Sequence, residues 1–169
     1  MSVSDGAVVD ADIYTMGHAQ VAGGAQVGHV GALVNALVQA ATDFAWYAAN
    51  NDNDQLRDAE VSRQAERDWD RLLDDVSTCD TGWGGHGCGS ISASLDDGTI
   101  VWPAGTYYLD ELELKGDVVI EVAGPVVLVL GESFSMRDEA RFNVAGDPSD
   151  LRILLPDAQV RLKDDAQLH

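Results

Sequence analysis

Basic residues are scarce in this sequence of 169 residues. Ten Lys and Arg stand against 29 Asp and Glu, which gives a formal net charge of −19, and only Lys115 and Lys163 are lysines. A chain this acidic repels nucleic acids and anionic lipids, so neither is an expected partner. Because repulsion between its own acids would strain the fold at low ionic strength, the composition favours adaptation to high salt. A simple solubilising surface is the alternative interpretation.

Long apolar segments are also missing. No apolar run approaches the ~18 residues that a membrane-spanning helix needs. Residues 1–5 have neither the basic n-region nor the apolar h-region of a secretory signal peptide. We therefore expect no direct membrane insertion of this chain. It is expected to be either cytosolic or separated from an export or anchoring segment.

Cysteine occurs only at Cys79 and Cys88, in a loop rich in glycine. Such a flexible loop closes easily, so a disulfide between the two is the first interpretation, and it would indicate an oxidising compartment. A zinc site formed with His86 is the second, although a fourth ligand and the usual CxxC spacing are missing. Two free thiols are the third.

Residues at catalytic spacing are missing as well. Pairs of acids such as Asp96 and Asp97 adjoin turn residues, where a solvated carboxylate is the usual state. His18 and His29 lack a Ser or Cys partner at a suggestive spacing, and the glycine-rich stretch 82–89 lacks the lysine of a phosphate-binding loop. The sequence therefore predicts a protein that is not an enzyme and has no cofactor, apart from a candidate calcium site considered below.

The main feature that the sequence does contain is a repeat. From Thr99 onward apolar and polar residues alternate with a period of two, and turn residues interrupt the alternation about every eight residues. An Ala-Gln-apolar phrase recurs in both halves of the chain, at 19–21, 25–27, 158–160 and 166–168. Short repeats of small and apolar residues are typical of β-solenoid rungs. We therefore predict a mainly β, single-chain β-solenoid, or parallel β-helix, with rungs in 1–30 and 98–169.

Between these rungs the period changes to that of a helix. Apolar residues fall at helical spacing over 31–49, and after a polar loop a second apolar face runs from about Asp54 to Val76. We expect these two segments to form a helical hairpin, followed by the glycine-rich cysteine loop. The hairpin and loop, at 31–97, are expected to be an insertion in one solenoid domain of residues 1–169.

Two phrases of the C-terminal half resemble a known family. PAGTYY at 103–108 leads into a strand, GPVVLVLG at 124–131 forms the next rung, and a rung of small and polar residues follows. In these motifs segment 98–169, with looser rungs at 6–30, resembles an uncharacterised β-helical domain of type IV pilus-associated and other cell-surface proteins of bacteria and haloarchaea. Its pattern is also similar to that of the polymer-forming bactofilins. The resemblance implies an extracellular or cell-surface module without an assigned activity.

Two kinds of ligand site are candidates. Carboxylates on successive turns, if they stack, would suit calcium, a cation that prefers oxygen ligands. The residues predicted for this calcium site are Asp147, Asp150, Asp157, Asp164 and Asp165. Trp83, in the glycine-rich loop, is the tryptophan expected to be exposed and able to stack on a sugar, whereas Trp46 and Trp69 are expected in the core of the hairpin.

The open ends of a solenoid carry unpaired strands. The hairpin is expected to cap one end, whereas no capping helix follows the C-terminal rung at 163–169. In the family that the sequence resembles, a further apolar strand usually follows that rung. We therefore expect an open C-terminal edge through which the protein self-associates, as a dimer or a filament.

These features lead to three functional hypotheses. The first is a non-enzymatic structural or assembly module of the cell surface, associated with pili or other envelope proteins. The second is a carbohydrate-binding module that uses a solenoid face and Trp83. The third is a β-helical enzyme that degrades polysaccharides with paired carboxylates.

Overall fold

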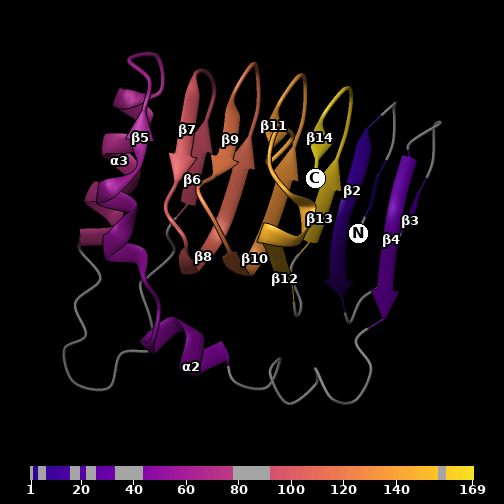
Figure 1. The fold of residues 1–169 in the computed structure, drawn as a ribbon, viewed down its shortest axis with the longest axis horizontal. Helices are drawn as coiled ribbons and strands as arrows, with labels where there is room; N and C mark the ends of the chain where they lie inside the picture. Colours follow the sequence, from indigo (N-terminus) through magenta and orange to yellow (C-terminus); the bar gives the residue numbers. More distant parts are fainter. Residues whose placement is uncertain are drawn as a thin grey trace.

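The chain winds into parallel coils whose strands stack rung upon rung, with helices at one end (Figure 1). The predicted fold class, a mainly β solenoid with inserted helices, is confirmed. The structure is a computed structural model, and it describes residues 2–3, 7–15, 20–21, 26–32, 44–77, 92–155 and 159–169.

Most of the described strands belong to the solenoid. They are β1 (Ser2–Val3), β2 (Val8–Thr15), β3 (Gln20–Val21), β4 (Gln26–Ala32), β5 (Glu60–Val61), β6 (Ser92–Leu95), β7 (Thr99–Trp102), β8 (Gly105–Leu114), β9 (Val119–Val122), β10 (Val126–Met136), β11 (Arg141–Phe142), β12 (Leu151–Leu155), β13 (Gln159–Leu162) and β14 (Gln167–Leu168). The described helices are α2 (Phe44–Ala49), α3 (Glu66–Ser77) and the 3-10 helices η1 (Asn53–Asp58) and η2 (Pro148–Asp150).

The stacked strands form three faces. The order on the first face is β6, β8, β10, β13, β1 and β3. The order on the second face is β7, β9, β11, β14, β2 and β4. The order on the third face is β8, β10, β12, β2 and β4. The long strands contribute to two faces because each of them bends at a corner, where β10 and β2 also show a shift of register.

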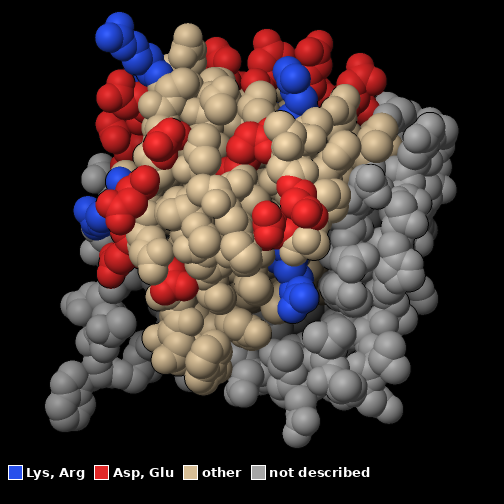
Figure 2. Space-filling view, viewed as in Figure 1, with Lys and Arg blue, Asp and Glu red and all other residues tan. Residues whose placement is uncertain are grey.

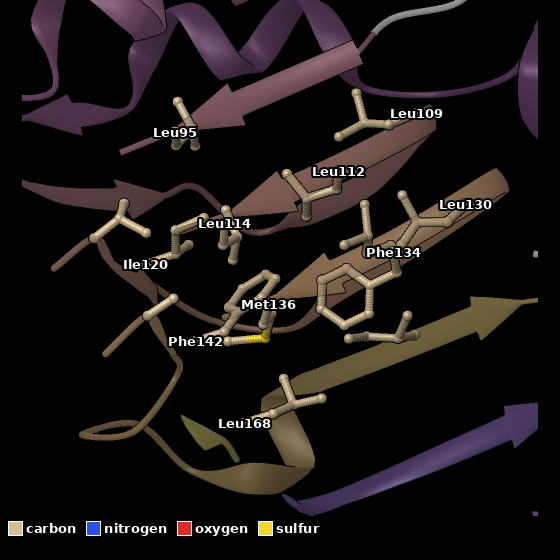
Figure 3. Close-up of a cluster of buried hydrophobic side chains, with 14 of the residues drawn as sticks. Leu95, Leu109, Leu112, Leu114, Ile120, Leu130, Phe134, Met136, Phe142 and Leu168 are labelled. Atoms are coloured by element: carbon tan, nitrogen blue, oxygen red, sulfur yellow. The ribbon is translucent and has the colours of Figure 1, made fainter. Parts of the chain in front are cut away.

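Alternation of apolar and polar residues decides which side chains fill the coils. In β8, Leu109 precedes the bend and Leu112 and Leu114 follow it, and all three are buried. Side chains of successive rungs stack in register, so that Leu114 lies between Leu95 and Met136 (Figure 3). Each rung therefore covers the apolar surface of the next. This burial stabilises the fold by about 25 cal/mol per Å² of apolar area removed from water.

The turns between the first and second faces share one backbone conformation. A residue with positive φ stands at the same place in successive turns: Gly116 (62°), Asp138 (60°) and Asp164 (57°). Glycine adopts this left-handed conformation without strain, and Asp adopts it more readily than most residues do. At Gly116 a Cβ would also overlap the backbone oxygen of Asp96 on the neighbouring rung. The positive φ thus explains why Gly and Asp occur at these turn positions in the sequence.

The N-terminal strands continue the stack beyond the C-terminal rung. β14 pairs with β2, with Leu168 opposite Val9, and β13 pairs with β1, with Leu162 opposite Val3. Both termini therefore lie within the stack (Figure 1). The expectation of an open C-terminal edge is wrong, because strands from the other end of the sequence supply the next rung. The last described strands of the stack on this side are β3 and β4.

The inserted segment caps the opposite end of the stack, as expected. Helix α3 packs against β6, and β5 pairs antiparallel with β7, with Val61 opposite Ile100. Trp69 and Leu72 of α3 are buried in the common core. The prediction of one continuous helix from about Asp54 onward is wrong, because η1 and β5 precede α3. Pairing with β7 supplies hydrogen bonds for an edge that a helix would leave open.

Candidate functional site

Two polar residues, Asp52 and Asn53, close the third face at the capped end, and we call them the polar junction. The carboxylate oxygen Oδ2 of Asp52 accepts a hydrogen bond from the backbone N–H of Thr106 at 2.8 Å, and the backbone N–H of Asp52 donates to the oxygen of Thr106 at 2.7 Å. One residue further, Asn53 accepts from the N–H of Tyr108 at 3.0 Å through Oδ1 and donates to its carbonyl oxygen at 2.7 Å through Nδ2. These four bonds occupy the place of a neighbouring strand, so the edge of β8 is sealed against pairing with another chain.

The residues before this junction hold it in place. At the end of α2, the side-chain amide of Asn50 donates to the oxygen of Trp46 at 2.9 Å, and that of Asn51 donates to the oxygen of Ala48 at 2.8 Å. The Oδ1 atom of Asn51 then accepts from the backbone N–H of Asn53 at 3.1 Å. Local side-chain bonds of this kind end a helix and fix the turn that follows. Asn53 is 3% exposed, so its bonds to β8 are shielded from water.

Two neighbouring tyrosines of β8 hold their phenolic protons unusually firmly. The Tyr107 hydroxyl donates to the carbonyl oxygen of Pro103 at 2.8 Å, and the Tyr108 hydroxyl donates to Oδ1 of Asp110 at 3.1 Å. Burial, together with the charges of Asp52 and Asp58, raises the pKa of Tyr107 to about 12. Burial and the adjacent Asp110 raise the pKa of Tyr108 to about 12.

We expect these tyrosines to make the fold sensitive to alkali. The pKa of each rises from 10.0 to about 12, so the unfolded chain loses these protons at lower pH than the folded protein does. The free energy of unfolding therefore falls as the pH rises from about 10 to 12, and this contribution is fully present below about 10. Urea denaturation at constant ionic strength across this window measures the decline.

Tyr108→Phe provides the comparison for this prediction. The variant keeps the ring but has no phenolic proton, so the decline between pH about 10 and 12 is expected to shrink by roughly half. An equal decline in the variant and the parent protein would contradict the assignment to Tyr108. A stability that stays constant across the window would contradict it for both tyrosines.

Charged side chains gather at the turns between the first and second faces, along one edge of the molecule (Figure 2). Two ion pairs link neighbouring rungs there: Lys115 Nζ lies 3.0 Å from Asp96, and Arg137 lies 3.2 Å from Glu113. The contact of Arg137 with Glu113 offsets part of the repulsion between acids of adjacent rungs. All four side chains are partly exposed, so each pair contributes little to stability on its own.

The structure separates the residues predicted to bind calcium. Asp147 and Asp150 lie between β11 and β12, whereas Asp164 and Asp165 lie in the turn between β13 and β14, and Asp157 lies outside the described residues. Hydrogen bonds from the backbone and side chain of Ser149 lower the pKa of Asp147 and make this carboxylate a helix cap of η2. Among the described residues, no three His, Cys, Asp or Glu side chains are grouped so that they would hold a metal ion.

The tryptophans do not lie where the sequence indicated. Trp46 is 52% exposed and packs edge-on against Tyr47 with ring centroids 5.2 Å apart, so its predicted place in the core is wrong. It lies on α2, a helix of six residues that ends beside the cap. Trp69 is buried, as predicted. Trp83 and the cysteine loop with Cys79 and Cys88 lie outside the described residues, so the exposure of Trp83 and the disulfide stay predictions.

A shallow groove of about 490 Å³ crosses the first face. Ser133 and Ser135 of β10 form its floor, since both alternate with the buried Phe134 and Met136 and face outward. Longer polar side chains of the flanking strands form its walls. These are Glu111 and Glu113 of β8 on one side and Gln159 and Arg161 of β13 on the other. Glu132, at the bend of β10, completes the lining.

No protein family, curated protein or solved structure matches this chain. None of the helices among the described residues is long and apolar enough to cross a membrane.

Neither the polar junction nor the groove was identified from the sequence. Asp52 and Asn53 belong to a run of polar residues that indicates a loop, and nothing local distinguishes Asn53 from Asn50. The sequence contains one weak indication of the groove. Two serines face outward in β10, and the neighbouring strands carry Glu, Gln and Arg at the paired positions. Recognising it requires the register between strands about 25 residues apart in sequence, which periodicity alone does not give.

Proposed function

We propose that this protein is a non-enzymatic structural module of the cell surface, which assembles with a second copy of itself or with other envelope or pilus proteins. The observation that carries the proposal is the asymmetry of the stack. Asp52, Asn53 and β5 seal one end, whereas the other end is bounded by β3 and β4. The resemblance of segment 98–169 to β-helical surface domains supports an extracellular or surface location.

The polar side chains of the capped end have structural partners. Asp52 and Asn53 bind the backbone of β8, and Tyr108 binds Asp110 at the corner. Similar contacts link the rungs, where Asp138 accepts from the backbone N–H of Gly116 at 3.3 Å. Groups arranged in this way stiffen a scaffold and fix its register. These contacts support a structural role, as a scaffold in an assembly, over a catalytic one.

The end bounded by β3 and β4 gives the assembly a defined form. β4 pairs with β2 on one side, and no described strand pairs with its other side. An unpaired edge of this kind is a template for another strand. Because the opposite end is sealed by the cap, a second copy is expected to meet the first through the edge of β4 in both copies. Such a contact is two-fold and closes at a dimer, in place of the filament that an open C-terminal rung would give.

Light scattering coupled to size exclusion, over a concentration series at high salt, tests the stoichiometry. We expect the mass to rise from that of a monomer to that of a dimer and then to remain constant, since screening removes the repulsion between the two acidic copies. Asp52→Ala removes the acceptor for the N–H of Thr106 and partly opens the sealed edge. This variant is expected to form species larger than the dimer.

Hydrogen exchange locates the contact. In concentrated samples the amides of β4 are expected to exchange about tenfold more slowly than in dilute ones. The amides of Thr106 and Tyr108 are expected to show no concentration dependence, because the cap already binds them. The same holds for β14, which is paired on both sides. A monomer at every concentration, or added protection at β14 in place of β4, would refute the proposed self-association.

A further inference from the structure

The groove on the first face has a shape that follows directly from its sequence and register. Ser133 lies between Glu111 and Gln159, and Ser135 lies between Glu113 and Arg161. Small side chains in the middle strand and long ones on both sides leave a trough two strand spacings wide, about 10 Å. The straight part of β10 beneath it runs from Ser133 to Met136, about 10 Å at the usual rise of a strand.

Three side chains of the trough already have partners before any ligand arrives. Arg137 pairs with Glu113 at 3.2 Å, and the guanidinium of Arg161 donates to Oε1 of Gln159 at 3.2 Å. Both contacts restrain long side chains and so lower the rotational freedom that they lose on binding. Strand β10 beneath them is paired on both sides, with β8 and β13, so the floor is rigid.

The chemistry of the trough indicates a ligand recognised through hydroxyl groups. The ring of Phe134 is fully buried, so this residue offers no apolar side chain to the groove. The groove lining otherwise consists of hydroxyl, carboxylate, amide and guanidinium groups, which donate to and accept from hydroxyls. An extended peptide is disfavoured, because a peptide strand binds at a sheet edge and the backbone of β10 already pairs with strands on both sides.

The charge of the groove selects among hydroxyl-rich ligands. Its lining carries three carboxylates, at Glu111, Glu113 and Glu132, and one guanidinium, at Arg161. The whole chain has a net charge of −19, so an anionic polymer is repelled both by the groove and by the surrounding surface. A neutral polymer of sugars meets no such barrier.

We propose that the trough over Ser133 and Ser135 binds one strand of a neutral polysaccharide. The ligand lies along β10, its hydroxyl groups donate to the carboxylates of β8, and they accept from the guanidinium of Arg161. This binding activity goes beyond the structural role proposed above, and either one can fail without the other.

Chemical-shift titration of the ¹⁵N-labelled full chain tests the site. The probes are xylohexaose, cellohexaose and chitohexaose as neutral oligomers, and an oligogalacturonate as the anionic comparison. At least one neutral oligomer is expected to shift the amides of 133–135 and 159–161 saturably, at an affinity at least about tenfold above that of the anionic oligomer. The absence of saturable shifts with all three neutral oligomers would overturn the proposal, as would tighter binding of the oligogalacturonate.

Variants on one strand separate groove binding from general effects. Ser135→Tyr fills the trough and is expected to weaken binding at least about tenfold. Val127→Tyr is the matched control, because it adds the same ring to β10 on the third face, beside Thr106 and Arg152, and is expected to change the affinity less than about twofold. Arg161→Met keeps the length of the wall side chain without its donors and is expected to weaken binding about three- to tenfold.

Melting curves and backbone spectra of the free variants show whether each is folded. Since Arg161→Met introduces no bulk, it tests the site even if Ser135→Tyr disturbs the sheet. Equal affinities of Ser135→Tyr, Val127→Tyr and the parent protein would overturn the proposal. Shifts confined to residues outside the first face would do the same.

Discussion

Replacing Asn53 with alanine is expected to lower the free energy of unfolding by about 3 to 5 kcal/mol. The side chain is 3% exposed and makes hydrogen bonds of 3.0 and 2.7 Å to the backbone N–H and carbonyl oxygen of Tyr108. Removing it leaves two backbone groups of β8 without a partner in a site that water does not reach readily. Each buried group left unsatisfied costs about 1 to 3 kcal/mol. Urea denaturation at neutral pH and constant salt measures the loss.

Asn50→Ala is the matched control for this prediction. The substitution is the same and lies three residues away, but the side chain of Asn50 is exposed and donates to Trp46 at the end of α2. Its loss is expected to cost less than about 1 kcal/mol, because water replaces the lost bond. If the two variants proved equally stable, the sealing role of Asn53 would be disproved. Asn53→Asp keeps the acceptor for Tyr108 but loses the donor, so it is expected to recover only part of the stability.

The rungs of this solenoid are predictable from sequence because each is a local signal. The strands from β7 to β13 alternate inward and outward residues along their straight parts, and a turn with Gly or Asp at positive φ precedes several of them. The shared Ala-Gln-apolar phrase also placed 1–30 and 98–169 in the same solenoid. The order in which the rungs stack is not a local property. Leu168 meets Val9 through a pairing between opposite ends of the sequence, and similar rungs do not specify their neighbours.

At the capped end, too, local sequence does not predict which single residues make the tertiary contacts. Helical spacing of apolar residues is present through the region before α3, yet Glu60 and Val61 form a strand because the edge of β7 is available there. Among the polar residues Asn50 to Asn53, intrinsic preference is nearly equal, and tertiary contact with β8 selects the last two. Trp46 and Trp69 both fit an apolar helical face, but only Trp69 reaches the solenoid core.

Trp102→Ala is expected to destabilise the protein by about 3 to 5 kcal/mol, the usual cost of deleting a buried aromatic side chain. Trp102 is fully buried on β7 and lies at the centre of an aromatic cluster. Its ring centroid is 5.5 Å from that of Tyr107, 5.6 Å from that of Phe142 and 6.0 Å from that of Trp69. Because Trp69 belongs to the cap and Phe142 to a rung further along the stack, the variant loosens both the core and the attachment of the cap.

Two further variants make the Trp102 prediction specific. Trp46→Ala removes the same side chain from a position that is 52% exposed, and it is expected to cost less than about 1 kcal/mol. Trp102→Phe keeps a ring in the cluster and removes an indole N–H that has no hydrogen-bond partner within the described residues. Since an unpaired buried donor is itself costly, this variant is expected to lose at least about 1 kcal/mol less than Trp102→Ala. Thermal and urea unfolding of the three variants and the parent protein at constant salt test this prediction. Equal losses of stability in Trp46→Ala and Trp102→Ala would contradict the central place of Trp102 in the core.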